Sequence, residues 1–252
     1  MCTVKKRFNK NYEIISNKEV CEGYFELEVK ADDVLDHCSP GQFFMIEIPG
    51  VFLRRPISVH STKKDTLSFL YKVVGKGTMI LSGIASGKIH LLGPLGKGYD
   101  LETYKAFNYV IVAGGTGIAS VHFLAMKLDK KGILYYGARS SKDLLCLNKF
   151  EKLGWKIEVS TEDGSKGYRG YITDVLEKNL KSDDIIFVCG PAPMLKKVME
   201  IAKLKNVKGF ASLEKKMACG LGNCQGCVVK VDGKIKMTCK DGPVFKIEQV
   251  EL

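Results

Sequence analysis

Four cysteines near the carboxyl end of the sequence have the spacing of a metal site, C-x4-C-x2-C-x11-C. The first three follow the plant-type [2Fe–2S] spacing, whereas zinc ribbons use paired C-x2-C units. Gly220, Gly222 and Gly226 lie among them, and a backbone with few Cβ atoms can wrap closely around a cluster and direct N–H groups at its sulfurs. The pattern favours an iron–sulfur cluster over a structural zinc site or two disulfides. The candidate metal ligands are Cys219, Cys224, Cys227 and Cys239.

A hairpin is predicted directly after the third cysteine. Val228–Val231 and Lys234–Thr238 are β-prone runs, and Asp232-Gly233 between them is a strong signal for a two-residue turn. Such a hairpin returns the chain to Cys239, which accounts for the short gap before the fourth cysteine. In the plant-type pattern this last cysteine lies much farther away. We expect residues 214–252 to form a small cluster-binding segment that is too short to fold without its metal.

The remaining cysteines, apart from Cys189, and the histidines show no ligand spacing. We expect these cysteines to be unreactive and the histidines to be isolated. They are Cys2, Cys21, Cys38, Cys146, His37, His60, His90 and His122.

The overall composition is that of an ordinary globular protein, with 252 residues of which 45% are hydrophobic and 27% charged. The net charge is +11, but the lysines are spread along the whole chain and no nucleic-acid motif accompanies them. No apolar run approaches the roughly 18 residues of a membrane span, and the first residues lack the apolar core of a signal peptide. We therefore expect no nucleic acid and no membrane as partners, and a cytoplasmic location that keeps thiols reduced.

Residues 1–100 consist of short apolar-alternating runs separated by turn residues, which predict a small antiparallel β-barrel. Turn signals such as Ser39-Pro40-Gly41 and Gly93-Pro94-Leu95-Gly96 separate the runs. One short helix is expected near Gly77–Ile84. The expected strands are Tyr12–Ile15, Tyr24–Val29, Phe43–Ile48, Ile57–His60, Leu67–Val74 and Lys88–Leu92.

An arginine-containing strand and a glycine-rich loop within this barrel indicate phosphate binding. Arg55 offers a planar set of donors suited to a pyrophosphate, Pro56 fixes the chain direction, and Ser58 presents a hydroxyl. Gly75-Lys76-Gly77-Thr78 is a flexible loop opening a helix, where free N–H groups favour phosphate. Each motif alone is explained as well by a surface arginine pair or a plain turn, but together they favour a flavin. The candidate FAD-binding residues are Arg55, Pro56, Ile57, Ser58, Leu70, Tyr71, Lys72, Gly77 and Thr78.

After Leu101 the pattern changes to alternating strands and helices, which predicts a doubly wound α/β nucleotide-binding domain over residues 101–213. Its first strand, Asn108–Ala113, is a continuous apolar run typical of a parallel strand buried on both faces. Ligands of such sheets bind at the carboxyl ends of the strands. The further expected strands are Ile133–Tyr136, Lys156–Ser160, Asp184–Val188 and Gly209–Leu213. The expected helices are one ending near Leu128, Leu145–Leu153, Tyr171–Asn179 and Pro191–Lys203.

Two strand ends carry motifs suited to a nucleotide. The first, residues 114–117, lies at a helix N-terminus, but Ser120 replaces the third glycine of the complete dinucleotide fingerprint. The second, residues 189–194, is a tight turn followed by a helix opened by proline. Cys189 taken alone is as well explained as a small buried side chain. The candidate nucleotide-binding residues are Gly114, Gly115, Thr116, Gly117, Cys189, Gly190, Pro191 and Met194.

These motifs together resemble the ferredoxin reductase superfamily. The R-x-x-S strand comes first in the chain, the G-x-G-T loop follows it, and the C-G-P-x-P-M turn comes last. By this resemblance Arg55 and Thr78 hold the FAD phosphates, Ser58 lies near the flavin N5, and Tyr71 packs on or beside the flavin. Cys189 lies against the nicotinamide ring. The resemblance thus makes Ser58 and Cys189 the candidate catalytic residues.

The choice between NAD and NADP stays open from the residues themselves. Arg139-Ser140 can meet a 2′-phosphate, whereas Glu162-Asp163 would repel one if it lies nearby. The family resemblance favours NAD.

The order of barrel, nucleotide domain and cysteine segment indicates one family within this superfamily. The last segment, with its ending C-K-D-G-P-V-F from Cys239 to Phe245, resembles the electron-transfer subunits of NAD-dependent class B dihydroorotate dehydrogenases. A nicotinamide exchanges a hydride and an iron–sulfur centre exchanges single electrons, so a flavin is needed to convert one into the other. The resemblance implies a partner catalytic subunit that oxidises dihydroorotate at its own FMN in pyrimidine (UMP) biosynthesis, and a heterotetramer of two plus two subunits.

Two alternative interpretations remain. One is the small subunit of a flavin-based NADPH–ferredoxin transhydrogenase, which shares this order of domains. The other is a non-enzymatic binding module in which zinc stabilises the cysteine segment.

Overall fold

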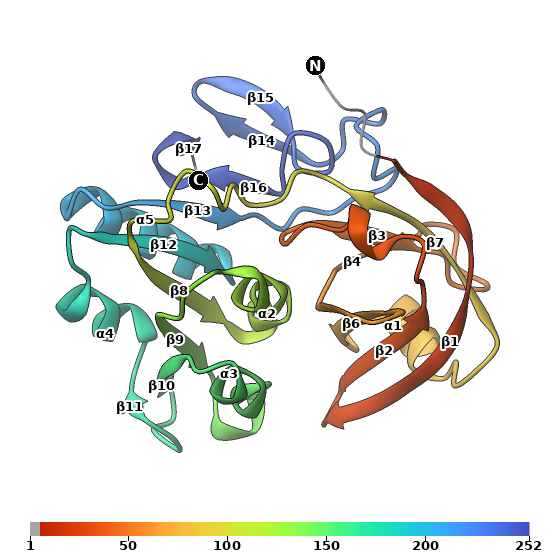
Figure 1. The fold of residues 1–252 in the computed structure, drawn as a ribbon, viewed down its shortest axis with the longest axis horizontal. Coiled ribbons are helices and arrows are strands. Elements are labelled where there is room, and N and C mark those ends of the chain that lie inside the picture. Colours follow the sequence, from red (N-terminus) through yellow and green to blue (C-terminus); the bar gives the residue numbers. More distant parts are fainter. Residues whose placement is uncertain (1–5, 252) are drawn as a thin grey trace.

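The computed structural model describes residues 6–251, which form two lobes bridged by the carboxyl-terminal segment (Figure 1). One lobe holds an antiparallel sheet of seven strands, the other a mainly parallel sheet of seven strands, and a three-stranded sheet lies near the carboxyl end. In Figure 1 the red-to-yellow and green-to-cyan lobes stand side by side, with the blue carboxyl-terminal strands above them. Cys2 lies outside the described residues.

The first lobe is a sheet in the order β4-β3-β7-β1-β2-β6-β5. Because β4 also contacts β6, the sheet curls into a half-barrel. Alternating apolar side chains fill it, as in the cross-strand pairs Leu27–Phe69 and Val29–Leu67, all four of which are fully buried. Its elements are β1 (Phe8–Cys21), β2 (Tyr24–Lys30), η1 (Leu35–His37), β3 (Phe43–Ile46), β4 (Arg55–Ser58), β5 (Ser61–Lys63), β6 (Thr66–Lys72), α1 (Lys76–Ser82) and β7 (Lys88–Leu95).

Strand β1 is much longer than the expected Tyr12–Ile15. Its fourteen residues pair with β7 in their first half and with β2 in their second half. Most of its side chains reach solvent, so the strand lacks a sustained apolar alternation. Strand β5 is too short to carry such a pattern.

The second lobe has the sheet order β11-β10-β9-β8-β12-β13-β16, with all pairs parallel except β13–β16. Helices cover both faces: Ile111 of β8 belongs to the same core cluster as α2 and α3, and Val110 to the cluster with α4 and α5. This confirms the predicted doubly wound α/β architecture. Its elements are β8 (Asn108–Gly114), η2 (Gly115–Gly117), α2 (Ile118–Lys127), β9 (Ile133–Ala138), η3 (Ser141–Asp143), α3 (Leu147–Lys152), β10 (Lys156–Thr161), β11 (Tyr168–Arg169), α4 (Ile172–Asn179), β12 (Asp184–Cys189), α5 (Ala192–Leu204) and β13 (Lys208–Ser212).

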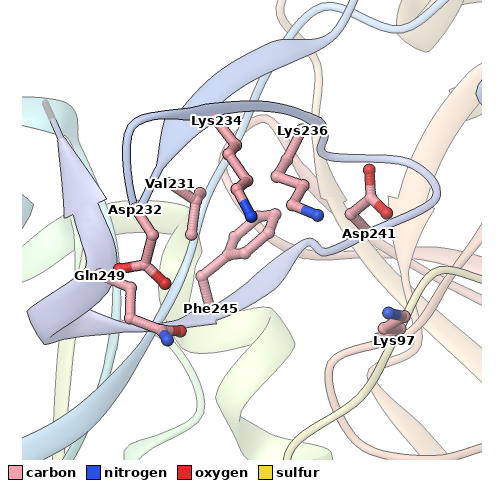
Figure 2. A pocket seen from close by; sticks show the side chains of 8 residues that line it. All are labelled: Lys97, Val231, Asp232, Lys234, Lys236, Asp241, Phe245 and Gln249. Atoms are coloured by element: carbon pink, nitrogen blue, oxygen red, sulfur yellow. The ribbon is translucent and has the colours of Figure 1, made fainter.

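The carboxyl-terminal segment is built around the predicted hairpin. Asp232 and Gly233 have φ values of 50° and 69°, as a type I′ turn requires, and join β14 (Val228–Val231) to β15 (Lys234–Met237). Strand β17 (Val250–Glu251) pairs with β14 on its other side, after η4 (Ile247–Gln249). A pocket of about 300 Å³ lies under this sheet, and Figure 2 shows Lys234 and Lys236 of β15 extending over it, with Phe245 below.

The second lobe contains a strand that the sequence did not predict. Beyond β13, which is the strand predicted at Gly209–Leu213, β16 (Val244–Lys246) pairs with the sheet in antiparallel fashion. The cysteine segment therefore contributes a strand to the nucleotide sheet. A three-residue strand that pairs across more than thirty residues leaves no periodic signal in the sequence.

Candidate functional site

The four predicted metal ligands lie together as two pairs. The backbone N–H of Cys224 donates to Cys219 Sγ at 3.5 Å, and that of Cys239 donates to Cys227 Sγ at 3.4 Å. Each iron of a four-cysteine [2Fe–2S] centre takes two thiolates, so two adjacent pairs suit such a centre. Within residues 6–251, no three His, Cys, Asp or Glu side chains are grouped closely enough to hold a single metal ion.

Backbone amides around the loop favour thiolate charge on Cys219. Burial opposes ionisation of this thiol, but hydrogen bonds from the N–H groups of Cys224, Leu221 and Asn223, together with the Cys224 side chain, lower its pKa to about 6. At the other end of the loop, burial and the neighbouring Cys227 raise the pKa of Cys239 to about 12. The loop therefore has a polar, partly open end and a buried end.

Exposure follows the same division. Cys227 and Cys239 are each 2% exposed, whereas Cys224 is solvent-exposed. A cluster held by these residues would approach the protein surface on the side of Cys224.

The cysteine loop packs on the half-barrel beside the arginine strand. A Cβ at Gly220 would lie 2.6 Å from Met45 Cγ, and Cys227 and Cys239 share an apolar cluster with Phe43, Met45 and Leu95. Strand β3 pairs with β4 so that Met45 lies opposite Pro56 and Phe43 opposite Ser58. Only one strand therefore separates the cysteine loop from the predicted FAD strand.

The structure brings the two phosphate motifs of the first lobe together. Arg55 and Gly77 are in close contact, since a Cβ at Gly77 would lie 2.7 Å from Arg55 Nε. Arg55 also donates a hydrogen bond to the carbonyl of Leu53. Thr78 Oγ1 accepts from the N–H of Val74 at 2.9 Å and donates to the carbonyl of Gly75 at 3.1 Å, which fixes the start of α1. Arg55 therefore lies at the first turn of α1, where a pyrophosphate would find both its charge and free N–H groups.

The three candidates on β6 point in different directions. Tyr71 lies in the half-barrel core, with its ring on Phe25 at 5.9 Å and its hydroxyl donating to Asn17 Oδ1 at 3.0 Å. Leu70 faces the other way, into the core shared with the second lobe. Lys72 donates to the hydroxyl of Tyr24 at 2.9 Å and lines the cavity between the lobes. Of the three side chains, only that of Lys72 reaches this cavity.

A cavity of about 1080 Å³ lies where the carboxyl ends of the parallel strands face the first lobe. Its size is that of a site for a large ligand. The glycine turns after β8 and β12 meet there, because a Cβ at Gly114 would lie 2.6 Å from Met194 Sδ and one at Gly190 would lie 3.0 Å from Gly114 N. Its lining includes the predicted residues Gly114, Gly115, Thr116, Gly117, Gly190, Pro191 and Met194.

Cys189 lies behind the wall of this cavity. It is 1% exposed, and its carbonyl packs under Gly117, where a Cβ would lie 2.2 Å away. Burial, reinforced by the charge of Glu214, raises the pKa of the Cys189 thiol to about 12. The thiol is therefore neutral and packed beneath the turn.

Several cavity residues lie outside the glycine motifs. Arg139 and Glu162 end adjacent strands, joined by the hydrogen bond from Glu162 N to Ala138 O at 3.1 Å, so the two opposing side chains considered for a 2′-phosphate lie side by side. Arg139 and Glu162 are close because of the register in which β9 and β10 pair, and this register cannot be derived from the sequence. The other lining residues of this kind include Tyr24, Asp143, Tyr171, Asp174, Lys197 and Glu214.

Comparison with known protein families and solved structures identifies the class of protein to which the chain belongs. Residues 214–251 match the family described as the iron–sulfur cluster binding domain of dihydroorotate dehydrogenase B, and residues 111–200 match the oxidoreductase NAD-binding domain. A solved structure of NADH-dependent reduced ferredoxin–NADP oxidoreductase superposes with a TM-score of 0.86 at 31% identity, covering 95% of this chain and 89% of that one. The fold and the matched regions define a ferredoxin-reductase-like oxidoreductase with an iron–sulfur segment.

Two curated relatives give the particular family. The dihydroorotate dehydrogenase B (NAD(+)) electron transfer subunit of Caldanaerobacter subterraneus subsp. tengcongensis is 39% identical over 250 residues, covering 97% of this chain and 99% of that one. The subunit of the same name from Clostridium acetobutylicum is 38% identical over 237 residues, covering 92% and 93%. The chain belongs to this family of electron-transfer subunits, which confirms the predicted resemblance. Within residues 6–251, no helix has both the length and the apolar character needed to cross a membrane.

Proposed function

We propose that this chain carries electrons from a partner dihydroorotate dehydrogenase subunit, which holds FMN, to NAD in the synthesis of UMP. The observation that carries the proposal is the spatial order of the three candidate sites. The cysteine loop packs on Met45 of β3, β3 pairs with the Arg55–Ser58 strand, and the first lobe borders the nucleotide cavity through Lys72. The sites therefore form a row from the surface at Cys224 to the cavity between the lobes.

The residues present fit an iron–sulfur cluster, FAD and NAD. The donor set of the cluster is two cysteine pairs with N–H groups directed at sulfur. For FAD, the absence of a side chain at Gly77 leaves space for the Arg55 guanidinium at the first turn of α1. For NAD, the cavity of about 1080 Å³ opens between two glycine turns. When bound, FAD would exchange single electrons with the cluster and a hydride with NAD.

The residues of the chain would bind and orient these groups. Cys219 and Cys224 would hold one iron, and Cys227 and Cys239 the other. Arg55 would neutralise the pyrophosphate of FAD, and Ser58, on the same strand, would face its ring. The remaining FAD candidates are Pro56, Ile57, Leu70, Tyr71, Lys72, Gly77 and Thr78.

The second lobe would hold the nicotinamide nucleotide. Gly114, Gly115, Thr116 and Gly117 would receive its phosphates, while Gly190, Pro191 and Met194 would border its ring. Because Cys189 is packed beneath Gly117, it would support this turn from below, and no proton transfer by its thiol is required.

The partner subunit would dock where the cluster approaches the surface. The β14–β15 hairpin follows Cys227 directly, and one of its faces presents Val228, 41% exposed, and Ile235, 68% exposed, together with Lys230. Exposed apolar side chains on a hairpin that joins two cluster ligands suit a protein partner that must exclude water from the path of the electron. We further propose a heterotetramer of two plus two subunits and a cytoplasmic location, where the reduced state of thiols favours cysteine ligation of iron.

The test is anaerobic co-expression with a candidate catalytic subunit, using the wild-type chain and Cys224→Ser. We expect the variant complex to lose dihydroorotate-dependent reduction of NAD while it still oxidises NADH with ferricyanide. Cys38→Ser is the matched control, because Cys38 is a half-buried thiol that packs on the half-barrel core and does not belong to the apolar cluster around the cysteine loop. Unchanged electron transfer in Cys224→Ser would refute the ligand assignment. A colourless wild-type protein without acid-labile sulfide would refute the redox function and favour a zinc-stabilised binding module.

A second candidate function is the small subunit of a flavin-based NADPH–ferredoxin transhydrogenase. The observation in its favour is the 31% identity to NADH-dependent reduced ferredoxin–NADP oxidoreductase. Cofactor analysis of the purified complex separates the two functions. A partner with FMN that turns over dihydroorotate supports the first, and a larger partner with several [4Fe–4S] clusters supports the second.

A further inference from the structure

Two histidines that are far apart in the sequence stack between the lobes. His60 lies on the link between β4 and β5 of the first lobe, and His122 lies on α2 of the second. Their ring centroids are 4.4 Å apart with an interplanar angle of 22°, and the residues are 0% and 4% exposed. The expectation that these histidines are isolated is therefore wrong, because the contact depends on how the lobes pack.

Hydrogen bonds determine the proton positions on both rings. His60 Nδ1 lies 2.8 Å from the carbonyl oxygen of Ala119, and His122 Nδ1 lies 3.1 Å from the carbonyl oxygen of His60. A carbonyl only accepts, so both Nδ1 atoms carry a hydrogen. His60 Nε2 lies 3.1 Å from Lys149 Nζ, and an ammonium only donates, so Nε2 carries none. In this arrangement His60 is a neutral imidazole with a defined tautomer.

The network crosses the lobes a second time. Lys149 of α3 also donates to both carboxylate oxygens of Glu26 on β2, at 2.8 and 2.7 Å. Four side chains, two in each lobe, are therefore joined by direct contacts. A polar network of this kind, with the two histidines buried and Lys149 and Glu26 half-buried, favours one relative position of the two lobes.

The pair lies close in sequence to both redox candidates. His60 follows Ser58 of the FAD strand by two residues, and Ala119, its acceptor, follows Gly117 of the nucleotide turn by two residues. The hydrogen bond between them thus links the strand that would hold the flavin to the turn that would hold NAD. A displacement of about 1 Å between two reacting rings can lower the rate of transfer up to about 100-fold.

We infer that His60 and His122 are positioning residues, which as a neutral stacked pair align the Arg55–Ser58 strand with the Gly115–Gly117 turn and lose this alignment when protonated. This inference rests on the proposed function, since the alignment matters only if hydride passes between the lobes.

The surrounding charges make protonation unfavourable. Lys149 of α3 and Lys63 of β5 act on both rings, and each ring would repel the other if both were charged. Glu26 of β2, whose carboxylate is 3.9 Å from His60 Nε2, is the opposing charge and is bound to Lys149. The edge of the Phe150 ring closes the other side of His122. Burial first and these charges second lower the pKa of His60 well below its usual value and that of His122 to about 4.

The sign of the pH effect follows from these shifts. Because the folded-state pKa of His122 lies below its unfolded value of about 6.5, the unfolded chain binds more protons between pH 6.5 and 4. The stabilisation is complete above this window and is lost as the pH falls through it. Acidification through this window should therefore weaken the contact that this pair makes between the lobes.

The test measures flavin reduction by NADH in stopped-flow pH jumps from 7 to as low as 3.5, each lasting less than a second. In the wild type we expect the rate constant to fall with a midpoint near pH 4, where His122 protonates. His122→Asn keeps a donor at the position of Nδ1 but cannot become charged, so its fall should begin at lower pH. Lys149→Gln keeps a donor to His60 but removes the positive charge, so its fall should begin at higher pH. His37→Asn, on a histidine packed against Phe8 of the first lobe, should match the wild type.

A second readout does not depend on hydride transfer. Nitrogen-15 NMR of the holoenzyme at pH 7 should show His60 and His122 as neutral Nδ1–H tautomers. A wild-type rate that is flat to pH 3.5, coincident midpoints in all variants, or Nε2–H tautomers would each overturn the inference. If NADH fails to reduce the flavin even at pH 7, the proposed function fails, and the NMR tautomers then decide whether the pair exists as described.

Discussion

Gly220 of the cysteine loop lies directly on Met45 of β3, so closely that a Cβ on Gly220 would be 2.6 Å from Met45 Cγ. The φ of Gly220 is +71°, in the left-handed region that side chains rarely adopt. Both the backbone of this residue and its contact therefore require glycine. The contact positions the cysteine loop on the strand that pairs with Arg55–Ser58.

The variant Gly220→Ala should weaken cluster binding. The left-handed conformation costs a residue with a side chain roughly 1–2 kcal/mol, and overpacking against Met45 adds about 1–3 kcal/mol. We expect iron and acid-labile sulfide per chain to fall by more than half, while FAD content is retained. Gly233→Ala is the matched control, because Gly233 also has a positive φ of +69° but has open space at its Cβ. Equal iron contents in the two variants would show that the contact with Met45 does not matter.

The variant Arg55→Ala should lose FAD. Arg55 lies against Gly77 at the first turn of α1, and its guanidinium is the charge that a pyrophosphate would meet there. Loss of a charge-assisted hydrogen bond costs about 1.5–3 kcal/mol, so we expect FAD to bind roughly 10- to 100-fold more weakly. Fluorescence titration of the deflavinated chain measures the change.

The neighbouring arginine provides the control. Arg54 forms an ion pair with Glu47 at 2.7 Å and donates a hydrogen bond to Asn9. Its guanidinium is therefore already bound to side chains on the surface of the half-barrel. Arg54→Ala should bind FAD as the wild type does. Equal losses in both variants would mean that general positive charge, and not the position of Arg55, holds the flavin.

The two phosphate motifs and the cysteine spacing could be predicted from the sequence because each is local. Arg55 and Gly77 are only 22 residues apart, and the residues next to each of them in the sequence are enough to indicate phosphate binding. The pairing of β13 with β16 and the stacking of His60 on His122 could not be predicted in this way. They depend on long-range register and on the packing of two lobes, for which hydrophobic periodicity gives no signal.

The variant Ile235→Glu should impair assembly with the catalytic subunit. Ile235 is 68% exposed on the hairpin that returns the chain to Cys239, and a carboxylate there would have to lose its water when a partner covers this surface. We expect the dissociation constant of the complex to rise about tenfold or more, with NADH oxidation by ferricyanide unchanged. Ile15→Glu is the matched control, since Ile15 is 51% exposed on β1 of the half-barrel. A complex of unchanged affinity would place the partner on another face.

The variant Glu162→Gln should relax the preference for NAD. Glu162 lines the cavity at the end of β10, beside Arg139 at the end of β9. A carboxylate at this edge can accept hydrogen bonds from the ribose hydroxyls of NAD and repels the 2′-phosphate of NADP, whereas Arg139 alone would attract that phosphate. Removing the carboxylate should lower the ratio of kcat/KM for NADH to that for NADPH by about tenfold, which corresponds to about 1.4 kcal/mol.

Glu158→Gln controls for the general loss of a negative charge, because Glu158 is exposed on the same strand but does not line the cavity. Ferricyanide reduction with each nucleotide measures the ratio without a partner subunit. If the ratio of kcat/KM for NADH to that for NADPH is unchanged in Glu162→Gln, or changes equally in Glu158→Gln, the cavity carboxylate does not select NAD. A ratio that changes only in Glu162→Gln would place the adenosine ribose at the ends of β9 and β10, and would orient the nicotinamide toward the glycine turns after β8 and β12.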